Sequence, residues 1–273
     1  MDTILAPTDF SPAGNNAVNY AAELAKFFDA KLVLVNSYSM PPVNYEGSFA
    51  VDIFTSLQKA SQEQLEALRK QVLQKNPFLE IECKVEMGVP YDVIQEAAKK
   101  YNADLIVMGI VGEAGKIKEH VIGSSAVRVA RHIEIPVFII PENVKYHKIH
   151  HISFACDLEK TEETVLVYIA KYFSKVFDAE LEVVNVERPK VEVTEEKAKT
   201  NLFMEMKLVS VKHKTVYISE NKIARGLEKY FKIHPTDVIM LNPKKHNVFH
   251  NLFNESVTKE LAFHAQKPIL TIH

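Results

Sequence analysis

The residues best suited to chemistry stand near the middle of the chain, where a glycine-rich loop joins an apolar run to a helix. Residues 103–109 read ADLIVMG, which is typical of a strand buried on both faces of a parallel sheet. The loop that follows Gly109 ends at Gly123, Ser124 and Ser125, just before an amphipathic helix. Glycine lets backbone N–H groups come close to a ligand, and the free N–H groups of a helix start favour an anion. This spacing fits a phosphate site, and it fits equally well an ordinary strand–loop–helix connection whose serines cap the helix.

Two other groups of side chains could do chemistry. His147, His150 and His151 could hold a metal, but they precede a predicted strand, where alternate side chains point to opposite faces, so a solvated strand start is favoured. Asp9 and Asp157 could be catalytic carboxylates, but neither has an obvious partner for acid–base work, which favours a ligand or capping role. The sequence contains no Walker A motif, nucleophile elbow or zinc signature. We therefore predict no catalytic residue and no metal site.

Composition bounds the class of protein. The 273 residues are 47% hydrophobic and 25% charged, as in a soluble globular protein of one large or two ordinary domains. The net charge of −2 does not favour nucleic acid or an anionic membrane as a partner, and no apolar run approaches the length of a membrane span. An acidic residue at position 2, where signal peptides carry basic ones, predicts a cytoplasmic location. Cys83 and Cys156 are expected to be buried, reduced thiols.

The elements that must position these residues alternate between strand and helix. Ser11-Pro12 opens the first helix, with serine as N-cap and proline in the first turn. The segment 37–50, which contains Pro41-Pro42 and Gly47, is predicted to be a loop. The expected strands are 3–8, 31–36, 79–86, 103–109 and 135–140, with a helix between each pair. Regular alternation of this kind predicts a parallel sheet with helices on both faces.

The same order then starts again. Residues 152–157, 177–185, 236–242 and 267–272 echo residues 4–9, 28–36, 103–109 and 135–140. We therefore predict two copies of one α/β domain, residues 1–143 and 147–273. The joint between them is short and lacks Gly and Ser, so we expect the copies to pack together.

The second copy differs where the phosphate argument applies. Asn242 stands in place of Gly109, and no glycine occurs from there to Pro268. Counted back from the shared proline, Glu255 takes the place of Gly123, which puts negative charge where phosphate would lie. The second copy is therefore predicted to carry a degenerate site.

These residues resemble the universal stress protein family over the whole chain, as a tandem of two domains. The resemblance rests on ILAPTDFS at residues 4–11, Gly88-x-Pro90, the 103–109 strand, and the set Gly109-x-x-Gly112…Gly123-Ser124. It implies doubly wound domains with five-stranded parallel sheets, paired as a pseudo-dimer, and it also allows a homodimer. One branch of the family binds ATP, which can be accompanied by Mg. In that branch the glycine set holds the phosphates.

Carried over residue by residue, the resemblance implies a site in the first domain. Gly109, Gly112, Gly123, Ser124 and Ser125 would face the phosphates and ribose. Pro7, Thr8 and Asp9 would line the nucleoside pocket, and the backbone at Ser37 would lie near adenine. All of these positions follow strands, at the edge where ligands bind in open α/β sheets.

One departure from the family pattern keeps three hypotheses open. Ten residues, 113–122, separate Gly112 from Gly123, which is one more than the ATP-binding pattern has. The first hypothesis is a stress-response module that binds an adenine nucleotide in its first domain. The second is a protein–protein interaction module of the same fold that binds no nucleotide and has a protein partner that the sequence does not name. The third is a slow ATPase, for which no dedicated base is apparent.

Overall fold

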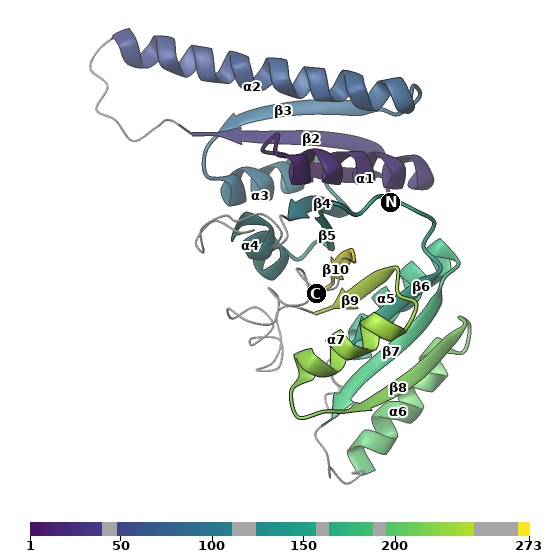
Figure 1. Ribbon diagram of the computed structural model, residues 1–273. Coiled ribbons are helices and arrows are strands. Elements are labelled where there is room, and N and C mark those ends of the chain that lie inside the picture. The colour runs from purple at the N-terminus through teal and green to yellow at the C-terminus, as the bar shows by residue number, and fades with distance from the viewer. Residues whose placement is uncertain (40–47, 111–123, 157–163, 188–194, 243–266) are drawn as a thin grey trace. The chain divides into compact units, whose positions relative to one another are not determined.

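The computed structural model describes residues 1–39, 48–110, 124–156, 164–187, 195–242 and 267–273 (Figure 1). The chain forms two compact units, Met1–Tyr146 and His147–His273. In the part of the chain that is described, no helix is both long enough and apolar enough to cross a membrane.

The first unit is a doubly wound α/β domain. Its elements are β1 (Thr3–Pro7), α1 (Pro12–Phe28), β2 (Lys31–Tyr38), α2 (Ser48–Lys75), β3 (Ile81–Met87), α3 (Pro90–Lys100), β4 (Leu105–Ile110), α4 (Ser124–His132) and β5 (Val137–Pro141). The five strands are parallel and lie in the order β3-β2-β1-β4-β5. Helices α1 and α2 cover one face, and α3 and α4 cover the other (Figure 1). The predicted fold class is confirmed.

The second unit repeats this order. Its elements are β6 (His151–Ala155), α5 (Thr164–Phe177), β7 (Glu180–Glu187), α6 (Glu195–Leu208), β8 (His213–Ser219), α7 (Ile223–Ile233), β9 (Val238–Leu241) and β10 (Ile269–Thr271). Its strands are also parallel, in the order β10-β9-β6-β7-β8. Helices α5 and α6 contact each other, and α7 packs on β7.

The repeat extends to individual hydrogen bonds. The Asp104 carboxylate accepts from the backbone N–H groups of Asp2 and Thr3, at 2.6 and 3.1 Å. Asp237 does the same for His150 and His151, at 2.8 and 2.9 Å. In each unit, a carboxylate that precedes the fourth strand therefore fixes the start of the first strand.

The segment that follows β5 is fastened to α1. The Asn16 side chain is buried, and its amide nitrogen donates to the carbonyls of Pro141 and Val144, at 3.1 and 2.7 Å. Its oxygen accepts from Lys145 Nζ at 2.8 Å, and the Tyr146 ring meets the Tyr20 ring edge-on at 5.2 Å. This end of the joint is therefore held by specific contacts rather than being a free tether.

Three sequence predictions are corrected. Ser37 and Tyr38 belong to β2, because they pair with Glu86 and Met87 of β3 instead of opening a loop. Residues 48–50, also assigned to that loop, form the first turn of α2. Cys83 is only partly buried, whereas Cys156 is buried as expected.

Candidate functional site

The candidate site lies at the carboxyl edge of the first unit's sheet, where the strand order reverses. From β1 the chain crosses by α1 to β2 on one side, whereas β4 pairs with β1 on the other side. In open α/β sheets this switch point opens a crevice for a ligand. The residues after β1 and at the end of β4, which include Asp9 and Gly109, meet at this edge.

Asp9 is exposed, and it organises the start of α1. Its Oδ1 accepts two hydrogen bonds from Ser11, from the backbone N–H at 3.0 Å and from the hydroxyl at 2.5 Å. Ser11 Oγ in turn accepts from the backbone N–H of Gly14 at 3.1 Å, which is the predicted N-cap. Within the described residues Oδ2 of Asp9 has no hydrogen-bond partner. This carboxylate oxygen is therefore open to a ligand.

Gly14 leaves room for the Asp9 and Thr8 side chains, which fold over the helix start. A Cβ at position 14 would lie 2.7 Å from Asp9 Oδ1 and 3.0 Å from Thr8 Oγ1. Phe10 supports the same turn, with a φ of 64° in the left-handed region that non-glycine residues seldom adopt. Its N–H donates to Thr8 Oγ1 at 3.0 Å, and its carbonyl accepts from the Asn15 side chain at 3.1 Å.

Pro7 and Thr8 close the first strand. Both are buried; Pro7 pairs with Val35, and the N–H of Thr8 donates to the carbonyl of Val35 at 2.8 Å. The Asn36 side chain donates to the carbonyl of Thr8 at 2.9 Å. The backbone of β2 continues past the end of β1 to Tyr38, so Ser37 lies on the overhanging part of the strand.

Gly109 lies against the first turn of α1. A Cβ at this position would lie 2.3 Å from the carbonyl oxygen of Ala13 and 2.8 Å from the backbone nitrogen of Gly14. Real Cβ contacts are not this short, so β4 can lie against the first turn of α1 only because residue 109 is glycine. The need for glycine here is thus explained by packing that sets the position of the α1 start.

The rest of the predicted phosphate set is only partly visible. Gly112 and Gly123 lie outside the described residues. Ser124 is the first residue of α4, and Ser125, the second, is half-buried. The structure thus brings Pro7, Thr8, Asp9, Gly109 and Ser37 to one edge of the sheet.

The second unit keeps the frame of this edge with different chemistry. Cys156 takes the place of Thr8; its N–H donates to Val184 at 3.2 Å, and its carbonyl accepts from Asn185 at 3.1 Å. Asn242, which replaces Gly109, is buried. The threonine hydroxyl and the glycine that shape the first edge are therefore both absent from the second.

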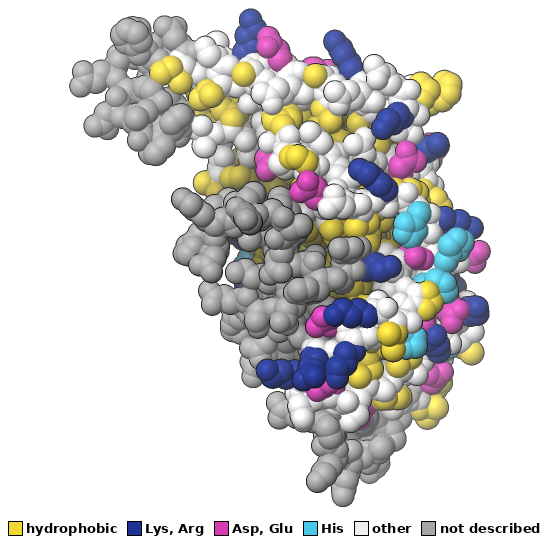
Figure 2. Space-filling model, in the orientation of Figure 1, with side chains coloured by type: hydrophobic (Ala, Val, Ile, Leu, Met, Phe, Trp, Pro, Cys, Tyr) yellow, Lys and Arg dark blue, Asp and Glu magenta, His cyan; other side chains and the backbone are white. Residues whose placement is uncertain are grey.

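The histidines at the start of the second unit lie beside Asp237. Figure 2 shows histidine side chains gathered at the surface near acidic ones. His147 Nδ1 is 3.9 Å from Asp237 Oδ1, while the other oxygen of Asp237 accepts from two backbone N–H groups. Among the residues that the structure describes, no group of three or more His, Cys, Asp or Glu side chains is placed to hold a metal ion.

Gly14 and Asn36 shape the edge but were missed from the sequence. The repeat carried a signal for Asn36, since Asn185 ends the matched block in the second copy and makes the matching bond. Gly14 offered no such signal, because its requirement comes from how the Asp9 and Thr8 side chains fold over it.

Comparison with known proteins connects this edge to a family. The sequence model of the universal stress protein family matches residues 1–141. A universal stress protein of Methanocaldococcus jannaschii is 32% identical over 145 residues, which cover 52% of this chain and 83% of that protein. A universal stress protein A homologue of Coxiella burnetii is 31% identical over 126 residues, 45% of this chain and 84% of that protein.

Among solved structures, a universal stress protein of Archaeoglobus fulgidus matches this chain along the length of both units. The TM-score is 0.75 over 99% of this chain and 97% of that one, at 19% identity. At this identity the likeness concerns the fold alone.

Proposed function

The chain belongs to the universal stress protein family, and we propose that its first unit binds an adenine nucleotide such as ATP and acts as a regulatory module. The observation that carries the proposal is the open carboxylate oxygen of Asp9 at the switch point of the sheet. A carboxylate in this place can accept from ribose hydroxyls or from the amino group of adenine. Asp9 is held for this task, because its other oxygen is tied to Ser11.

The proposed arrangement assigns one part of the nucleotide to each element. The overhang of β2 at Ser37 lies beside adenine, and Pro7 and Thr8 form the floor of the nucleoside pocket. The phosphates lie toward the start of α4, where Ser124, Ser125 and the two glycines before them supply N–H and hydroxyl donors. Magnesium, when it accompanies ATP, is held mainly through phosphate oxygens, as is usual for this ion.

Equilibrium dialysis with ATP tests the proposal. Asp9→Asn keeps an oxygen that can accept from Ser11 but removes the charge, so the fold is retained while affinity falls at least about tenfold. The matched control is Asp157→Asn, the corresponding aspartate of the second copy, which leaves affinity unchanged. No ATP retained by the wild-type protein, or equal retention by all three proteins, contradicts the proposal.

A second candidate function, self-association or partner binding through α6, rests on one surface observation. One side of α6 carries exposed apolar side chains that continue to the residue after the helix. They are Leu202, Met206 and Val209, which are 64%, 67% and 80% exposed. Large apolar side chains grouped at the surface mark interaction sites more often than scattered ones do.

The first copy offers an internal comparison for this stripe. β3 pairs with β2 as β8 pairs with β7, and the bond from Leu79 to Asn76 recurs between Val211 and Leu208. By this register Lys70 and Gln74 stand where Leu202 and Met206 do, and all four are exposed. The fold therefore does not require apolar residues here. Sedimentation of the wild type and of Leu202→Lys/Met206→Gln tests self-association; a monomer in both cases at about 100 μM excludes it.

A further inference from the structure

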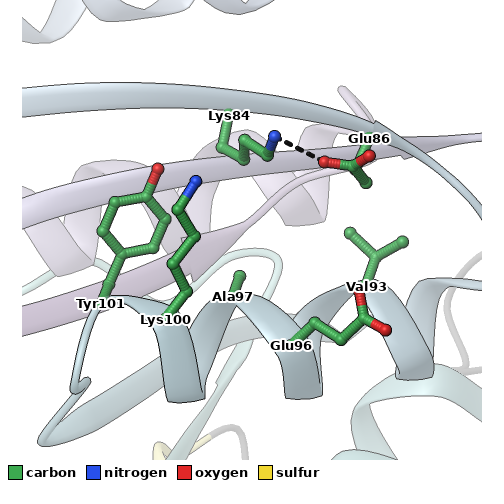
Figure 3. Close-up of a pocket in the computed structure, with 7 residues that line it drawn as sticks. All are labelled: Lys84, Glu86, Val93, Glu96, Ala97, Lys100 and Tyr101. Atoms are coloured by element: carbon green, nitrogen blue, oxygen red, sulfur yellow. Dashed lines mark ion pairs between the residues drawn. The ribbon is translucent and has the colours of Figure 1, made fainter.

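A pocket in the first unit lies away from the edge at Asp9 and Gly109, between the edge strand β3 and helix α3. It has a volume of about 290 Å³ and is lined by Lys84, Glu86, Val93, Glu96, Ala97, Lys100 and Tyr101 (Figure 3). Its existence follows from the sheet order. As the last strand of this unit's sheet, β3 has a neighbouring strand on one side only, and α3 packs mainly over β2 and β1. The side chains of β3 that point toward α3 are thus left partly uncovered.

The charges of this pocket are sorted by sign. The ammonium groups of Lys84 and Lys100 lie toward the Tyr101 end, and the carboxylates of Glu86 and Glu96 lie toward the Val93 end (Figure 3). The sorting arises because α3 runs back antiparallel to β3, which places Lys84 of the strand opposite Lys100 of the helix. Facing like charges destabilise a fold, so packing alone does not explain this pattern.

Two of the four charges form no ion pair among the described residues. Lys84 Nζ and Glu86 Oε2 form an ion pair along the strand at 2.5 Å. Lys100 and Glu96 are one helical turn apart, and within the described residues neither forms an ion pair or a hydrogen bond, although the charge of Lys100 contributes to the lowered pKa of Glu82. Lys100 Nζ instead lies 5.3 Å from the centre of the Tyr101 ring. The tyrosine hydroxyl is already in use, since it donates to Glu82 Oε1 at 2.6 Å.

An apolar surface separates the two charged ends. Val93 and Ala97 are each 5% exposed and form the floor, and the Tyr101 ring closes one end. Glu96 and Lys100 are four residues apart on α3, so their backbone positions are separated by about 6 Å along the groove. The volume is at the lower end of the roughly 300–1,000 Å³ usual for ligand pockets, which limits the occupant to about the size of one amino acid.

We propose that this pocket binds a short linear zwitterion, an ω-amino acid whose carboxylate lies between Lys84 and Lys100 and whose ammonium group lies near Glu86 and Glu96. The methylene chain of such a ligand covers Val93 and Ala97. The ligand brings an opposite charge to Lys100 and to Glu96, which form no ion pair among the described residues, and it lies between the like charges that face each other. The inference does not depend on nucleotide binding, because no residue of the pocket belongs to the edge at Asp9 and Gly109.

The test uses the full chain and titration calorimetry with 5-aminovalerate, with valerate and pentylamine as ligands that carry one charge each. Wild-type protein is expected to bind 5-aminovalerate with a dissociation constant between about 10 μM and 1 mM, in the range for so small a ligand. The two singly charged ligands are expected to bind at least about tenfold more weakly.

A charge swap within α3 gives the sharpest variant. In Glu96→Lys/Lys100→Glu, the strand lysine faces a glutamate and the strand glutamate faces a lysine, so the groove neutralises itself. Binding of 5-aminovalerate is lost, and the midpoint of thermal unfolding rises by about 1–4 °C. If these charges served the fold alone, the gain in thermal stability would not be accompanied by a loss of 5-aminovalerate binding. The matched control is Lys59→Glu/Glu63→Lys, the same exchange on α2, where the native pair is 3.9 Å apart and exposed.

Three results overturn the proposal. The first is no binding of 5-aminovalerate by wild-type protein at 10 mM or below, about ten times the weakest affinity expected. The second is equal binding by the wild type and the α3 swap. The third is binding of valerate as tight as that of 5-aminovalerate, which identifies a plain anion site.

Discussion

Replacement of Gly109 by alanine tests whether this glycine serves packing. The added Cβ would lie 2.3 Å from the carbonyl oxygen and 2.5 Å from the carbonyl carbon of Ala13. Both atoms belong to the backbone of α1, so no side chain can rotate out of the way. To make room, the helix start must move away from β4 by roughly an ångström, since carbon–oxygen contacts need more than 3 Å.

The expected cost follows from two opposing terms. Overpacking a tight contact costs about 1–3 kcal/mol, and a backbone obstacle places this case at the upper end. Replacing glycine restricts the unfolded chain, which returns about 0.4–1 kcal/mol. We therefore expect Gly109→Ala to lower the free energy of unfolding by about 2 kcal/mol, or the thermal midpoint by about 4–8 °C. Urea denaturation followed by circular dichroism measures the change.

Gly14→Ala is the matched control, because there the obstacles are side-chain oxygens. The new Cβ meets Asp9 Oδ1 at 2.7 Å and Thr8 Oγ1 at 3.0 Å, and both groups can turn aside. Alanine also gains about 1 kcal/mol of helix propensity, so stability changes by less than about 1 kcal/mol. ATP affinity falls nevertheless, because Asp9 is displaced. A Gly109→Ala protein as stable as the wild type refutes the packing argument.

Four further predictions follow from contacts within single units. Tyr230 and Tyr101 each donate to a glutamate, at 2.5 and 2.6 Å, but Glu182 is 0% and Glu82 41% exposed. Tyr230→Phe should therefore destabilise by about 2–3 kcal/mol and Tyr101→Phe by less than about 1 kcal/mol in urea denaturation, and equal losses would refute the burial argument. Hydrogen bonds from Lys31 and then Tyr101 lower the pKa of Glu82 in the folded protein. The ionised Glu82 therefore stabilises the fold fully above its unfolded-state pKa, and this stabilisation is lost as pH falls through the lower folded-state pKa. Between pH 6 and 3 the thermal midpoint should thus fall more in the wild type than in Glu82→Gln, and parallel curves would contradict this. Asn16→Ala removes three hydrogen bonds that hold residues 141–145. Limited proteolysis should then cut this segment several-fold faster than in the wild type. Equal rates would show that these hydrogen bonds are not needed to hold the segment. Burial raises the pKa of Cys83 to about 12, so its thiol should react with Ellman's reagent at pH 8 only when the first unit unfolds, and rapid reaction of the folded protein would count against this.

The architecture could be predicted because periodic and repeated patterns in the sequence indicate its strands, helices and domains. Buried strands appear as apolar runs, the first helix has its Ser11 cap, and four blocks recur in order. The β2 boundary was wrong because Ser37 and Tyr38 are strand residues only through their pairing with β3, which no local pattern shows. Residues 48–50 were not recognised as the first turn of α2, because the segment just before them is rich in turn signals.

The candidate site was predictable as a set of positions but not as a set of contacts. Pro7, Thr8 and Asp9 follow β1, and their place at the carboxyl edge results from the parallel topology alone. The packing role of Gly109 depends on its approach to Ala13, a residue far away in the sequence. The like-charge groove between β3 and α3 was equally hidden, because it depends on which residues of the helix stand opposite which residues of the strand.

The two copies separate what the fold requires from what a ligand requires. Both retain the carboxylate that fixes the first strand, Asp104 and Asp237, and the asparagine that fixes its end, Asn36 and Asn185. These residues build the edge and need no ligand to explain them. Thr8 and Gly109 give way to Cys156 and Asn242 although strand order and register are kept, so the fold tolerates their loss. The first unit needs Gly109 so that β4 can approach α1 closely. The fold itself therefore does not require glycine at this position. The need for it belongs to the particular position of the Asp9 turn, which is the feature that the proposed nucleotide site uses.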